Sequence, residues 1–383
     1  MERDELADWL RLARTPGIGD GAARKLLAAF GLPGNVFAQT SAALRDVVTP
    51  AQATALHAAP NGLDAQVALT WQWLQGGEAE GAVRRLVTLG DAGYPAALLE
   101  TADPPLMLYL LGAPAFDLTQ LGRSLAIVGS RNPTPQGESN ARAFARAFVD
   151  ADIAVVSGLA LGVDGAAHQG ALEAVQGGDA AEARLATVAV VGTGLDRVYP
   201  ARHRALAHRI SAHGLIVSEF ALGTPPLNQN FPKRNRIIAG LTRGTLVIEA
   251  ALQSGSLITA RMAVEQGREV FAIPGSIHSP QSRGCHALIR QGAKLVESVQ
   301  DVLEELPLDA PAASRRTAAA AVPMQAEAST LLRAIGFDPV GLDALCARTG
   351  HPAATLQVLL LVLELDGRLA RLPGGLFQRM ANA

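Results

Sequence analysis

The sequence predicts an α/β fold, a Rossmann-like doubly wound mostly parallel sheet, with a small all-α N-terminal domain and a winged-helix-like C-terminal domain. Two observations in the middle of the chain favour this sheet. Short runs of apolar and β-branched residues recur there, and stretches with helical character, such as residues 137–149 and 165–175, separate several of them. Continuous apolar strands that alternate with helices are typical of a parallel sheet covered on both faces. The expected strands are residues 125–128, 153–156, 186–191, 215–217, 245–248 and 269–273.

The length of 383 residues suits two to three domains. Many turn residues make the stretch around residues 75–123 a connector, in which apolar residues 106–111 add one strand. We expect a helical domain over residues 1–75, a Rossmann-like domain with this lead-in connector over 76–306, an alanine- and proline-rich linker over 307–325 and a winged-helix-like domain over 326–383.

The composition constrains partners and compartment. A net charge of −2 and a pI near 6.5 mean that any polyanion site must be a local patch. Aromatic residues make up 4%, so extensive base stacking would have few residues to use. Cys285 and Cys346 form no C-x-x-C pair, which excludes a disulfide scaffold and a cysteine zinc site. An acidic start and the lack of a long apolar run lead us to expect a cytoplasmic protein without a membrane span.

Residues 231–260 hold the strongest local signal. Lys233, Arg234 and Arg236 come just before an apolar helical run, and strand 245–248 leads into the turn Ser254-Gly255-Ser256. Each helix start offers unpaired N–H groups and the positive end of a helix dipole, so each is suited to a phosphate. The alternative is an ordinary solvated cationic face, which the neighbouring Phe231 disfavours.

Turns after parallel strands gather at one edge of the sheet, where ligands bind. Ser130 and Arg131 follow the first expected strand of this sheet, so they should share a rim with the 254–256 turn, and one pocket is expected there. The loop G-S-R-N-P-T-P-Q-G lacks the glycine spacing of a dinucleotide site, and no Gly-Lys pair supports a P-loop.

The remaining polar candidates each have two readings. Asp164 and His168 could form an acid–base or metal pair, but Asp164 as a helix N-cap beside His168 is favoured. Glu249 is the best lone candidate for a catalytic carboxylate, but a structural role, accepting N–H groups or pairing with an arginine, is favoured. No convincing metal-ligand set emerges, and we predict neither a catalytic residue nor a cofactor.

Near the N-terminus, Pro16-Gly17-Ile18-Gly19 matches a helix-hairpin-helix turn. In that motif, backbone N–H groups contact a phosphate without reading sequence, which makes Gly17 and Gly19 secondary DNA-binding candidates. An ordinary helix connection with a capping glycine explains the same residues equally well.

Six ordered motifs between about residues 94 and 296 resemble the DNA-processing protein A family (DprA, also called Smf). They are I-V-G-S-R, V-S-G-L-A-L-G-V-D-G-A-A-H, V-G-T-G-L-D-R-V-Y-P, F-P-K-R-N-R-I-I-A-G, E-A-A-L-Q-S-G-S-L-I-T-A and G-R-E-V-F-A-I-P-G. The resemblance implies a homodimer that binds single-stranded DNA during natural transformation, protects the incoming strand and loads the RecA recombinase onto it. The family is not known as an enzyme.

The resemblance also implies a basic pocket for the DNA backbone. Carried over by motif, the DNA-binding residues would be Ser130, Arg131, Lys233, Arg234, Asn235, Arg236, Ser254, Gly255 and Ser256. The family commonly has Y-P-x-x-N after the G-T-G-L-D turn, where this chain has Tyr199-Pro200-Ala201-Arg202-His203. Arg202 and Arg204 are the candidates to replace the missing polar contacts.

The C-terminal part has a winged-helix pattern, with helices near residues 329–335, 342–348 and 353–365 and a hairpin over 367–377 that contains Gly374-Gly375. The third helix has no Lys or Arg, so groove reading is disfavoured and a protein-contact or capping role is favoured. Arg368, Arg371 and Arg379 on the wing are the counter-evidence.

Two rival functions stay open at this point. One is a Rossmann-like nucleotide (phosphoribo)hydrolase resembling lysine-decarboxylase-like proteins. In those proteins a catalytic glutamate follows the phosphate-binding helix start, whereas Glu249 precedes the turn here and the next acid, Glu265, comes late in the helix. The other is a scaffold in which contact with RecA matters more than contact with DNA.

Overall fold

The structure is a computed structural model that describes residues 1–76, 81–175, 184–306, 331–332, 334–335, 340–365, 368–372 and 376–379. The chain divides into two compact units, Met1–Leu308 and Asp309–Ala383, and each is described by itself. In the described ranges, no helix is both long and apolar enough to cross a membrane.

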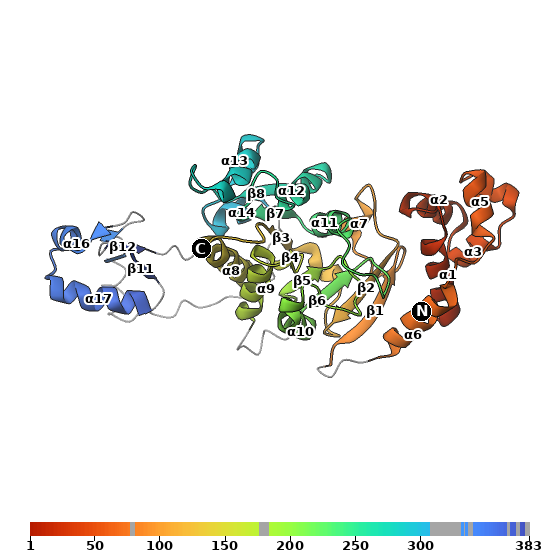
Figure 1. The fold of residues 1–383 in the computed structure, drawn as a ribbon, viewed down its shortest axis with the longest axis horizontal. Helices are drawn as coiled ribbons and strands as arrows, with labels where there is room; N and C mark the ends of the chain where they lie inside the picture. Colours follow the sequence, from red (N-terminus) through yellow and green to blue (C-terminus); the bar gives the residue numbers. More distant parts are fainter. Residues whose placement is uncertain are drawn as a thin grey trace. The chain divides into compact units, whose positions relative to one another are not determined.

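The larger unit is built on a nine-stranded sheet in the order β1-β2-β6-β5-β4-β3-β7-β8-β9 (Figure 1). All neighbours from β6 to β9 are parallel, while β1 with β2 and β2 with β6 are antiparallel. The strands are β1 (Val83–Thr88), β2 (Met107–Gly112), β3 (Ser124–Val128), β4 (Ala154–Ser157), β5 (Thr187–Val190), β6 (Leu215–Ser218), β7 (Gly244–Val247), β8 (Glu269–Ala272) and β9 (Lys294–Leu295). The predicted strands correspond to β3 through β8 within one residue at each end, so the mostly parallel Rossmann-like sheet is confirmed.

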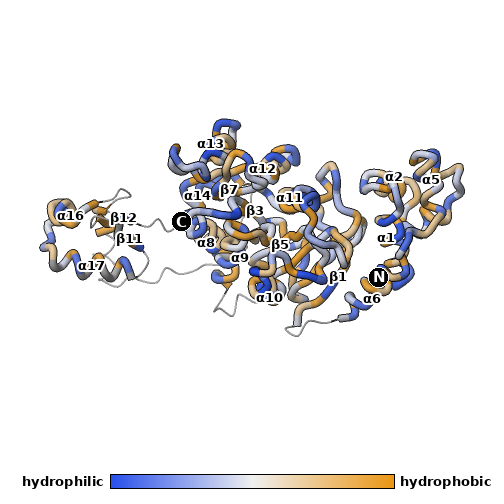
Figure 2. The backbone as a smooth tube through the Cα atoms, in the orientation of Figure 1, coloured by the Kyte–Doolittle hydropathy of each residue, from blue (hydrophilic) through white to orange (hydrophobic). Residues whose placement is uncertain are grey.

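The reason for this agreement is burial. Every residue of β3, β4, β5, β6 and β7 is buried, which demands the continuous apolar runs seen in the sequence. Val156, Val190 and Val247 belong to one hydrophobic core under the sheet. Along the covering helices, hydrophobic and hydrophilic residues alternate (Figure 2).

The interpretation of residues 75–123 as a connector with one strand was incomplete. The expected strand is β2, but β1 precedes it and pairs with it antiparallel, from Val83 opposite Gly112 to Thr88 opposite Met107. Strand β1 reads V-R-R-L-V-T and is mostly half-buried at the sheet edge. An edge strand with two arginines carries no continuous apolar signal, which is why the sequence analysis missed it.

Helices connect the parallel strands, and successive helices pack on one another: α8 on α9, α9 on α10, and α11 on α12. Their bounds are α7 (Ala96–Leu99), α8 (Pro135–Asp150), α9 (Val163–Ala174), α10 (Arg204–His213), α11 (Asn230–Gly240), α12 (Ser256–Glu265), α13 (Arg283–Arg290) and α14 (Val299–Glu305). Short 3₁₀ helices in the described residues include η1 (Leu118–Gly122), η3 (Ala201–His203) and η4 (Pro280–Ser282).

The N-terminal segment is helical, as predicted. It contains α1 (Arg3–Arg14), α2 (Asp20–Phe30), α3 (Pro33–Phe37), α4 (Ser41–Arg45), α5 (Pro50–Leu56) and α6 (Leu63–Gln75). Trp9, Leu26 and Leu44 form its core, and Leu106 and Met107 from the start of β2 join the same cluster. The helical segment therefore packs against the sheet within one compact unit.

The smaller unit contains α16 (Leu342–Thr349), α17 (Ala353–Leu365) and a three-stranded sheet in the order β10-β12-β11. The strands are β10 (Val340–Gly341), β11 (Leu369–Leu372) and β12 (Leu376–Arg379). The predicted helices 342–348 and 353–365 and the hairpin are confirmed, and Leu345, Leu356 and Phe377 share one core. The linker 307–325 and Gly374-Gly375 lie outside the described residues, and the helix 329–335 does so in part.

Candidate functional site

A cavity of about 520 Å³ opens where the strand order of the sheet reverses. Strands β3 and β7 are parallel neighbours, and from them the chain leads away in opposite directions, to β4 on one side and to β8 on the other. In open α/β sheets this switch point, beyond the carboxyl ends of the strands, is where ligands bind. The cavity is lined by residues after β3 (Gly129, Ser130, Arg131, Asn132), after β4 (Ala160, Asp164), on α11 (Phe231, Pro232, Arg234, Asn235), after β7 (Ala251, Gln253, Ser254, Gly255, Ser256) and by others including Gln281.

The loop after β3 is held in place so that Arg131 faces the open cavity. Ser130 is buried, its Oγ accepts the Asn132 N–H at 3.1 Å, and its carbonyl accepts the Val163 N–H at 3.1 Å. The Gln281 amide donates to the Asn132 carbonyl at 3.2 Å. Arg131 itself is exposed, and its guanidinium lies 5.6 Å from the centroid of the Phe231 ring. A loop held by hydrogen bonds thus presents an exposed cation.

The start of α12 forms the opposite wall. Gly255 is the N-cap residue, and Ser256 is the first residue of this ten-residue helix. The hydroxyls of Ser254 and Ser256 lie 2.7 Å apart. The helix dipole places partial positive charge at this end, so two hydroxyls and a helix start face the cavity with Arg131. The predicted meeting of Ser130 and Arg131 with Ser254, Gly255 and Ser256 is therefore found.

Arg234 also lines the cavity, but it is built into the wall. Its side chain is buried and donates to the Gly158 carbonyl at 3.0 Å. A Cβ on Gly158 would lie 1.7 Å from Arg234 Nη1, so this contact needs glycine. Burial lowers the pKa of Arg234 to about 10, and the charge of Asp164 opposes that shift. Arg234 stays a cation, but one that is already committed to neighbouring protein groups.

Asp164 is the buried counter-charge of this wall. Burial raises the pKa of its carboxyl, and Arg234 counteracts the rise. The prediction that Asp164 is a helix N-cap was wrong: Gly162 is the N-cap of α9, and Asp164 lies inside the first turn, where it accepts the Ala160 N–H at 3.2 Å. The sequence pattern was misread because glycine with φ of +80° starts this helix in place of a capping side chain.

His168 is fully buried rather than poised in a site. Its Nδ1 lies 2.7 Å from Thr187 Oγ1, whose own proton goes to the Val155 carbonyl at 2.8 Å, so Nδ1 donates. Its Nε2 has no hydrogen-bond partner, and burial lowers the pKa of His168 to about 3. Across the described residues, no group of three His, Cys, Asp or Glu side chains is arranged to hold a metal ion.

Glu249 has a structural role in this arrangement. It follows β7, and its carboxylate accepts the Thr134 N–H at 2.9 Å and the Thr134 hydroxyl at 2.5 Å. Thr134 in turn caps α8 by accepting the Gly137 N–H at 3.0 Å. The interpretation that Glu249 accepts a backbone N–H is confirmed, and both of its oxygen atoms are engaged.

An aromatic pair flanks the cavity, and sequence reasoning missed it. The Tyr199 side chain is 47% exposed, and its ring lies 5.8 Å from Phe231, centroid to centroid. A smaller cavity of about 80 Å³ lies beside these rings and shares Arg131 and Arg234 with the main cavity. The available signal was Tyr199 itself, in the V-Y-P motif after a Rossmann strand, next to a region rich in cations.

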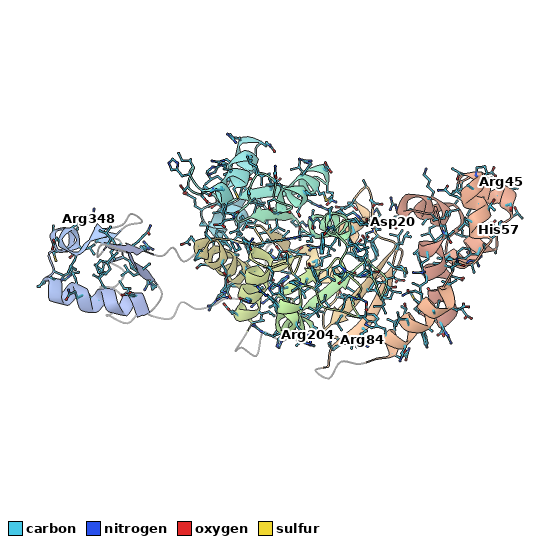
Figure 3. The ribbon with its side chains drawn as sticks, in the orientation of Figure 1. Asp20, Arg45, His57, Arg84, Arg204 and Arg348 are labelled. Carbon is cyan, nitrogen blue, oxygen red and sulfur yellow. The ribbon has the colours of Figure 1, made fainter. Side chains whose placement is uncertain are left out.

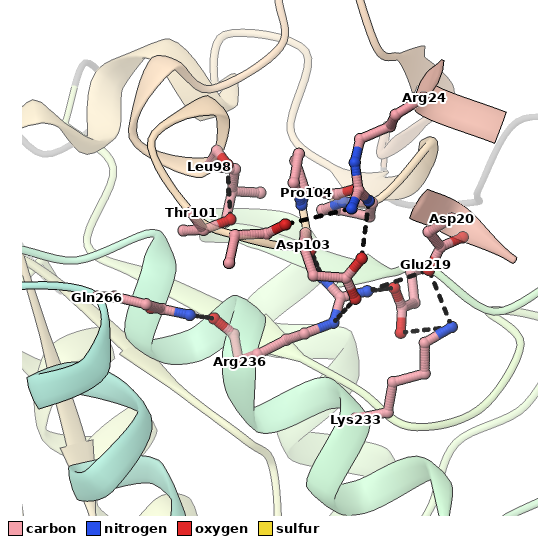
Figure 4. Close-up of polar contacts among 12 residues, drawn as sticks. Asp20, Arg24, Leu98, Thr101, Asp103, Pro104, Glu219, Lys233, Arg236 and Gln266 are labelled. Atoms are coloured by element: carbon pink, nitrogen blue, oxygen red, sulfur yellow. Dashed lines mark hydrogen bonds and ion pairs between the residues drawn. The ribbon is translucent and has the colours of Figure 1, made fainter. Parts of the chain in front are cut away.

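Lys233 and Arg236 do not line the main cavity. The expectation that all four residues of the K-R-N-R motif line one pocket is therefore wrong for these two, and their contact with DNA stays a prediction. The motif also lies within α11, which begins at Asn230, rather than before the helix. Both side chains instead meet carboxylates from other segments (Figure 4).

The secondary candidates lie apart from the cavity. Gly17, with φ of +80°, and Gly19, the N-cap of α2, form the expected turn between α1 and α2. An ordinary connection has the same geometry, so phosphate contact there stays a prediction. Arg202 and Arg204 are exposed and line neither cavity; Figure 3 shows Arg204 at the surface of α10.

The fold and the site together define a Rossmann-like protein with an arginine-lined cavity at the switch point of its sheet, beside the aromatic pair Tyr199 and Phe231. Comparison with known families is specific: the model of DNA recombination-mediator protein A matches residues 85–307, and the model of the DprA winged helix domain matches residues 312–375. The chain belongs to the DNA recombination-mediator protein A family.

Related proteins and solved structures support the same family assignment. The chain is 43% identical over 302 residues to Protein Smf of Escherichia coli, covering 76% of each chain. It is 46% identical over 215 residues to DNA processing protein DprA of Streptococcus pneumoniae, covering 56% of this chain and 72% of that protein. The structure of Streptococcus pneumoniae DprA is similar, with a TM-score of 0.64 and 35% identity over 81% of this chain and 99% of that one. A structure of DNA processing protein A from Helicobacter pylori, described for its single-stranded DNA binding mode, has a TM-score of 0.50 and 28% identity over 58% of this chain and 97% of that one.

Proposed function

We propose that this chain binds single-stranded DNA without sequence preference through the cavity at the switch point, and that it processes incoming DNA in natural transformation. Family membership supports this, as does the single-strand binding ascribed to the Helicobacter pylori relative. One observation carries the proposal for this chain: exposed Arg131 stands on a fixed loop across from the start of α12.

The chemistry of that arrangement suits a phosphodiester. An arginine fork binds phosphate oxygens in a defined geometry, and a helix start with serine hydroxyls adds donors and positive potential. Contacts to phosphate carry no sequence information, so such a site binds every sequence similarly. The residues proposed to bind the phosphate are Ser130, Arg131, Asn235, Ser254, Gly255 and Ser256. The buried Arg234 adds positive charge behind them.

The aromatic pair favours a single strand over a duplex. Tyr199 and Phe231 lie beside the phosphate-binding cavity. A base stacks on an aromatic ring only when it is free of its own stack and partner, which is the normal state in a single strand. A duplex would offer the phosphate alone.

The family resemblance supports three finer proposals. The chain acts as a homodimer in the cytoplasm, it hands the strand to the RecA recombinase, and it has no catalytic activity of its own. The winged helix would contact protein rather than DNA, because the sequence of α17 (Ala353–Leu365) contains no Lys or Arg. Pull-down of purified RecA and light scattering of the purified chain test the first two.

The rival nucleotide-hydrolase reading is less well supported. It needs a glutamate free to act on a bound nucleotide, and Glu249 is hydrogen-bonded to Thr134 through both oxygen atoms. Release of free base from nucleoside monophosphates by the purified chain would revive it.

The decisive experiment is binding of a labelled single-stranded oligonucleotide, and of its duplex, across a salt series. Wild type should prefer the single strand and show a log–log slope of about −0.7 per phosphate neutralised. Arg131→Ala should weaken binding to every sequence alike and make the slope shallower. The matched control is Arg290→Ala, which removes an exposed arginine on α13 outside the cavity and should bind as wild type. Wild-type binding by Arg131→Ala would move the site elsewhere.

A further inference from the structure

Six charged side chains from four separate segments meet beside α11 (Figure 4). We call this group the charge clamp. It consists of Asp20 and Arg24 on α2, Asp103 after α7, Glu219 after β6, and Lys233 and Arg236 on α11. The clamp joins the N-terminal helical segment to the sheet and to α11.

Arg236 is at the centre of the clamp. Its guanidinium pairs directly with the Glu219 carboxylate, lies 3.4 Å from Asp103 and 3.7 Å from Asp20, and is 11% exposed. The Asp103 carbonyl also accepts from it, and the Gln266 amide of α12 donates to the Arg236 carbonyl at 3.2 Å. This side chain is therefore surrounded by protein partners.

Lys233 completes the contact with the helical segment. Its ammonium lies 3.3 Å from Asp20 and 3.6 Å from Glu219. On the outer side, Arg24 pairs with Asp103 at 2.7 Å and donates to the Pro104 carbonyl at 3.0 Å. Helix α2 is therefore connected to the rest of the unit twice, through Asp20 to Lys233 and through Arg24 to Asp103.

The clamp is electrically balanced. Three carboxylates, Asp20, Asp103 and Glu219, face three cations, Arg24, Lys233 and Arg236. A phosphate would have to displace a carboxylate to reach Arg236, while the more exposed Lys233 ammonium already lies between two carboxylates. Displacing Glu219 is the most costly case, because this carboxylate is 5% exposed and burial already raises its pKa against the pull of Arg236.

Helical periodicity explains why four neighbouring residues divide into two groups. At 100° per residue, Phe231, Arg234 and Asn235 lie on one face of α11, and Lys233 and Arg236 lie on nearly the opposite one. The first face lines the cavity, and the second faces the clamp.

We propose that Lys233 and Arg236 are positioning residues: through Asp20, Asp103 and Glu219 they lock the N-terminal helices onto α11, set the orientation of its cavity face, and do not contact the DNA. The link to DNA rests on the proposed function. The clamp makes Asp20, a residue of the helical segment, a determinant of single-strand affinity at a distance from the strand.

The direction in which single-strand affinity changes in two charge-neutralising variants tests this proposal. Lys233→Met removes a positive charge and Asp20→Asn removes a negative one, yet both open the same clamp. Both should weaken single-strand binding by roughly two- to fivefold, with the slope of the salt series unchanged, because a partly exposed ion pair contributes modestly. The double variant should lose less than the sum of the two single losses, because both substitutions remove the Lys233–Asp20 pair. The matched control is Arg243→Met, which also removes an exposed cation but lies outside both the cavity and the clamp. This variant should bind single-stranded DNA as wild type does.

A phosphate ligand would behave differently. Lys233→Met would then weaken binding and make the slope shallower by about 0.7, while Asp20→Asn would tighten binding by removing repulsion. That opposite pair of signs overturns the proposal, and so does wild-type affinity in both single variants.

Including Arg131→Ala in the same salt series separates failure of the proposed function from failure of the clamp proposal. If wild type fails to bind, or Arg131→Ala binds as wild type, the proposed function has failed, and the clamp is then judged by thermal unfolding. There, Lys233→Met and Asp20→Asn should each lower the unfolding midpoint by roughly 2 °C, and the double variant should lower it by less than the sum of the two. Additive losses would overturn the clamp independently of DNA.

Discussion

Replacing Arg234 by Met should unfold the larger unit more readily, in contrast to the same change at Arg131. Arg234 and Asp164 are both buried, at 5% and 7% exposure, and the charge of each favours the ionised form of the other. Methionine fills much of the space but leaves Asp164 buried without its cation and the Gly158 carbonyl without its donor. Breaking a buried charge pair by removing one partner costs about 3–5 kcal/mol. Arg131→Met, at an exposed side chain, should change stability by about 0.5 kcal/mol or less.

The assay is urea unfolding of the full chain at pH 7, followed by circular dichroism, on wild type, Arg234→Met, Arg131→Met and the double variant Asp164→Asn/Arg234→Met. The double variant should recover part of the loss, because a neutral amide is cheaper to bury than an unpaired carboxylate. A loss below about 1 kcal/mol in Arg234→Met, together with lost DNA binding, would refute the reasoning and make Arg234 a ligand that is free to reach the strand.

Two further predictions concern the half-buried Glu249 and the fully buried His168. Glu249→Gln keeps the shape of the side chain, but the amide cannot accept both Thr134 donors. The substitution should therefore lower the free energy of unfolding by about 1 kcal/mol and weaken single-strand binding less than Arg131→Ala does. A larger loss of binding than in Arg131→Ala would make Glu249 part of the binding machinery. His168, with a pKa of about 3 in the fold against 6.5 as its ordinary value, binds its proton more readily in the unfolded chain, so stability should fall as pH drops below 6.5, by about 1.4 kcal/mol per pH unit from this group. His168→Asn should flatten that dependence between pH 6.5 and 5 in the same urea assay, and an unchanged pH dependence would contradict the assignment.

The strands illustrate when a sequence is sufficient. Strands β3 to β7 are buried on both faces, so nearly every position must be apolar, and the run is visible without any knowledge of neighbours. Strand β1 carries Arg84 and Arg85 on a half-buried edge, where Arg84 lies 5.6 Å from the Trp73 ring and Arg85 donates to the Phe116 carbonyl. Those cations are accommodated by residues from other segments, which local sequence does not reveal.

The switch-point rule explains the part of the site that was predicted. Once the strands are known to be parallel, the residues that follow them must gather at one edge, so Ser130 and Arg131 meet Ser254 and Ser256 without further information. The motif resemblance then supplies the ligand, since a cavity for an anion does not by itself name single-stranded DNA.

The sequence by itself determined the buried strands β3 to β8 and the presence of a cluster of cations, because each depends on residues close together in the chain. Only the tertiary structure decided which cations are available. Lys233, Arg234 and Arg236 are nearly adjacent in sequence, yet Arg234 is committed to Gly158 and Asp164, while Lys233 and Arg236 face Asp20, Asp103 and Glu219. Asp20, for example, lies 213 residues from Lys233 in the chain. The free energy of a charge depends on its nearest counter-charge and its exposure to water, and only folding sets these.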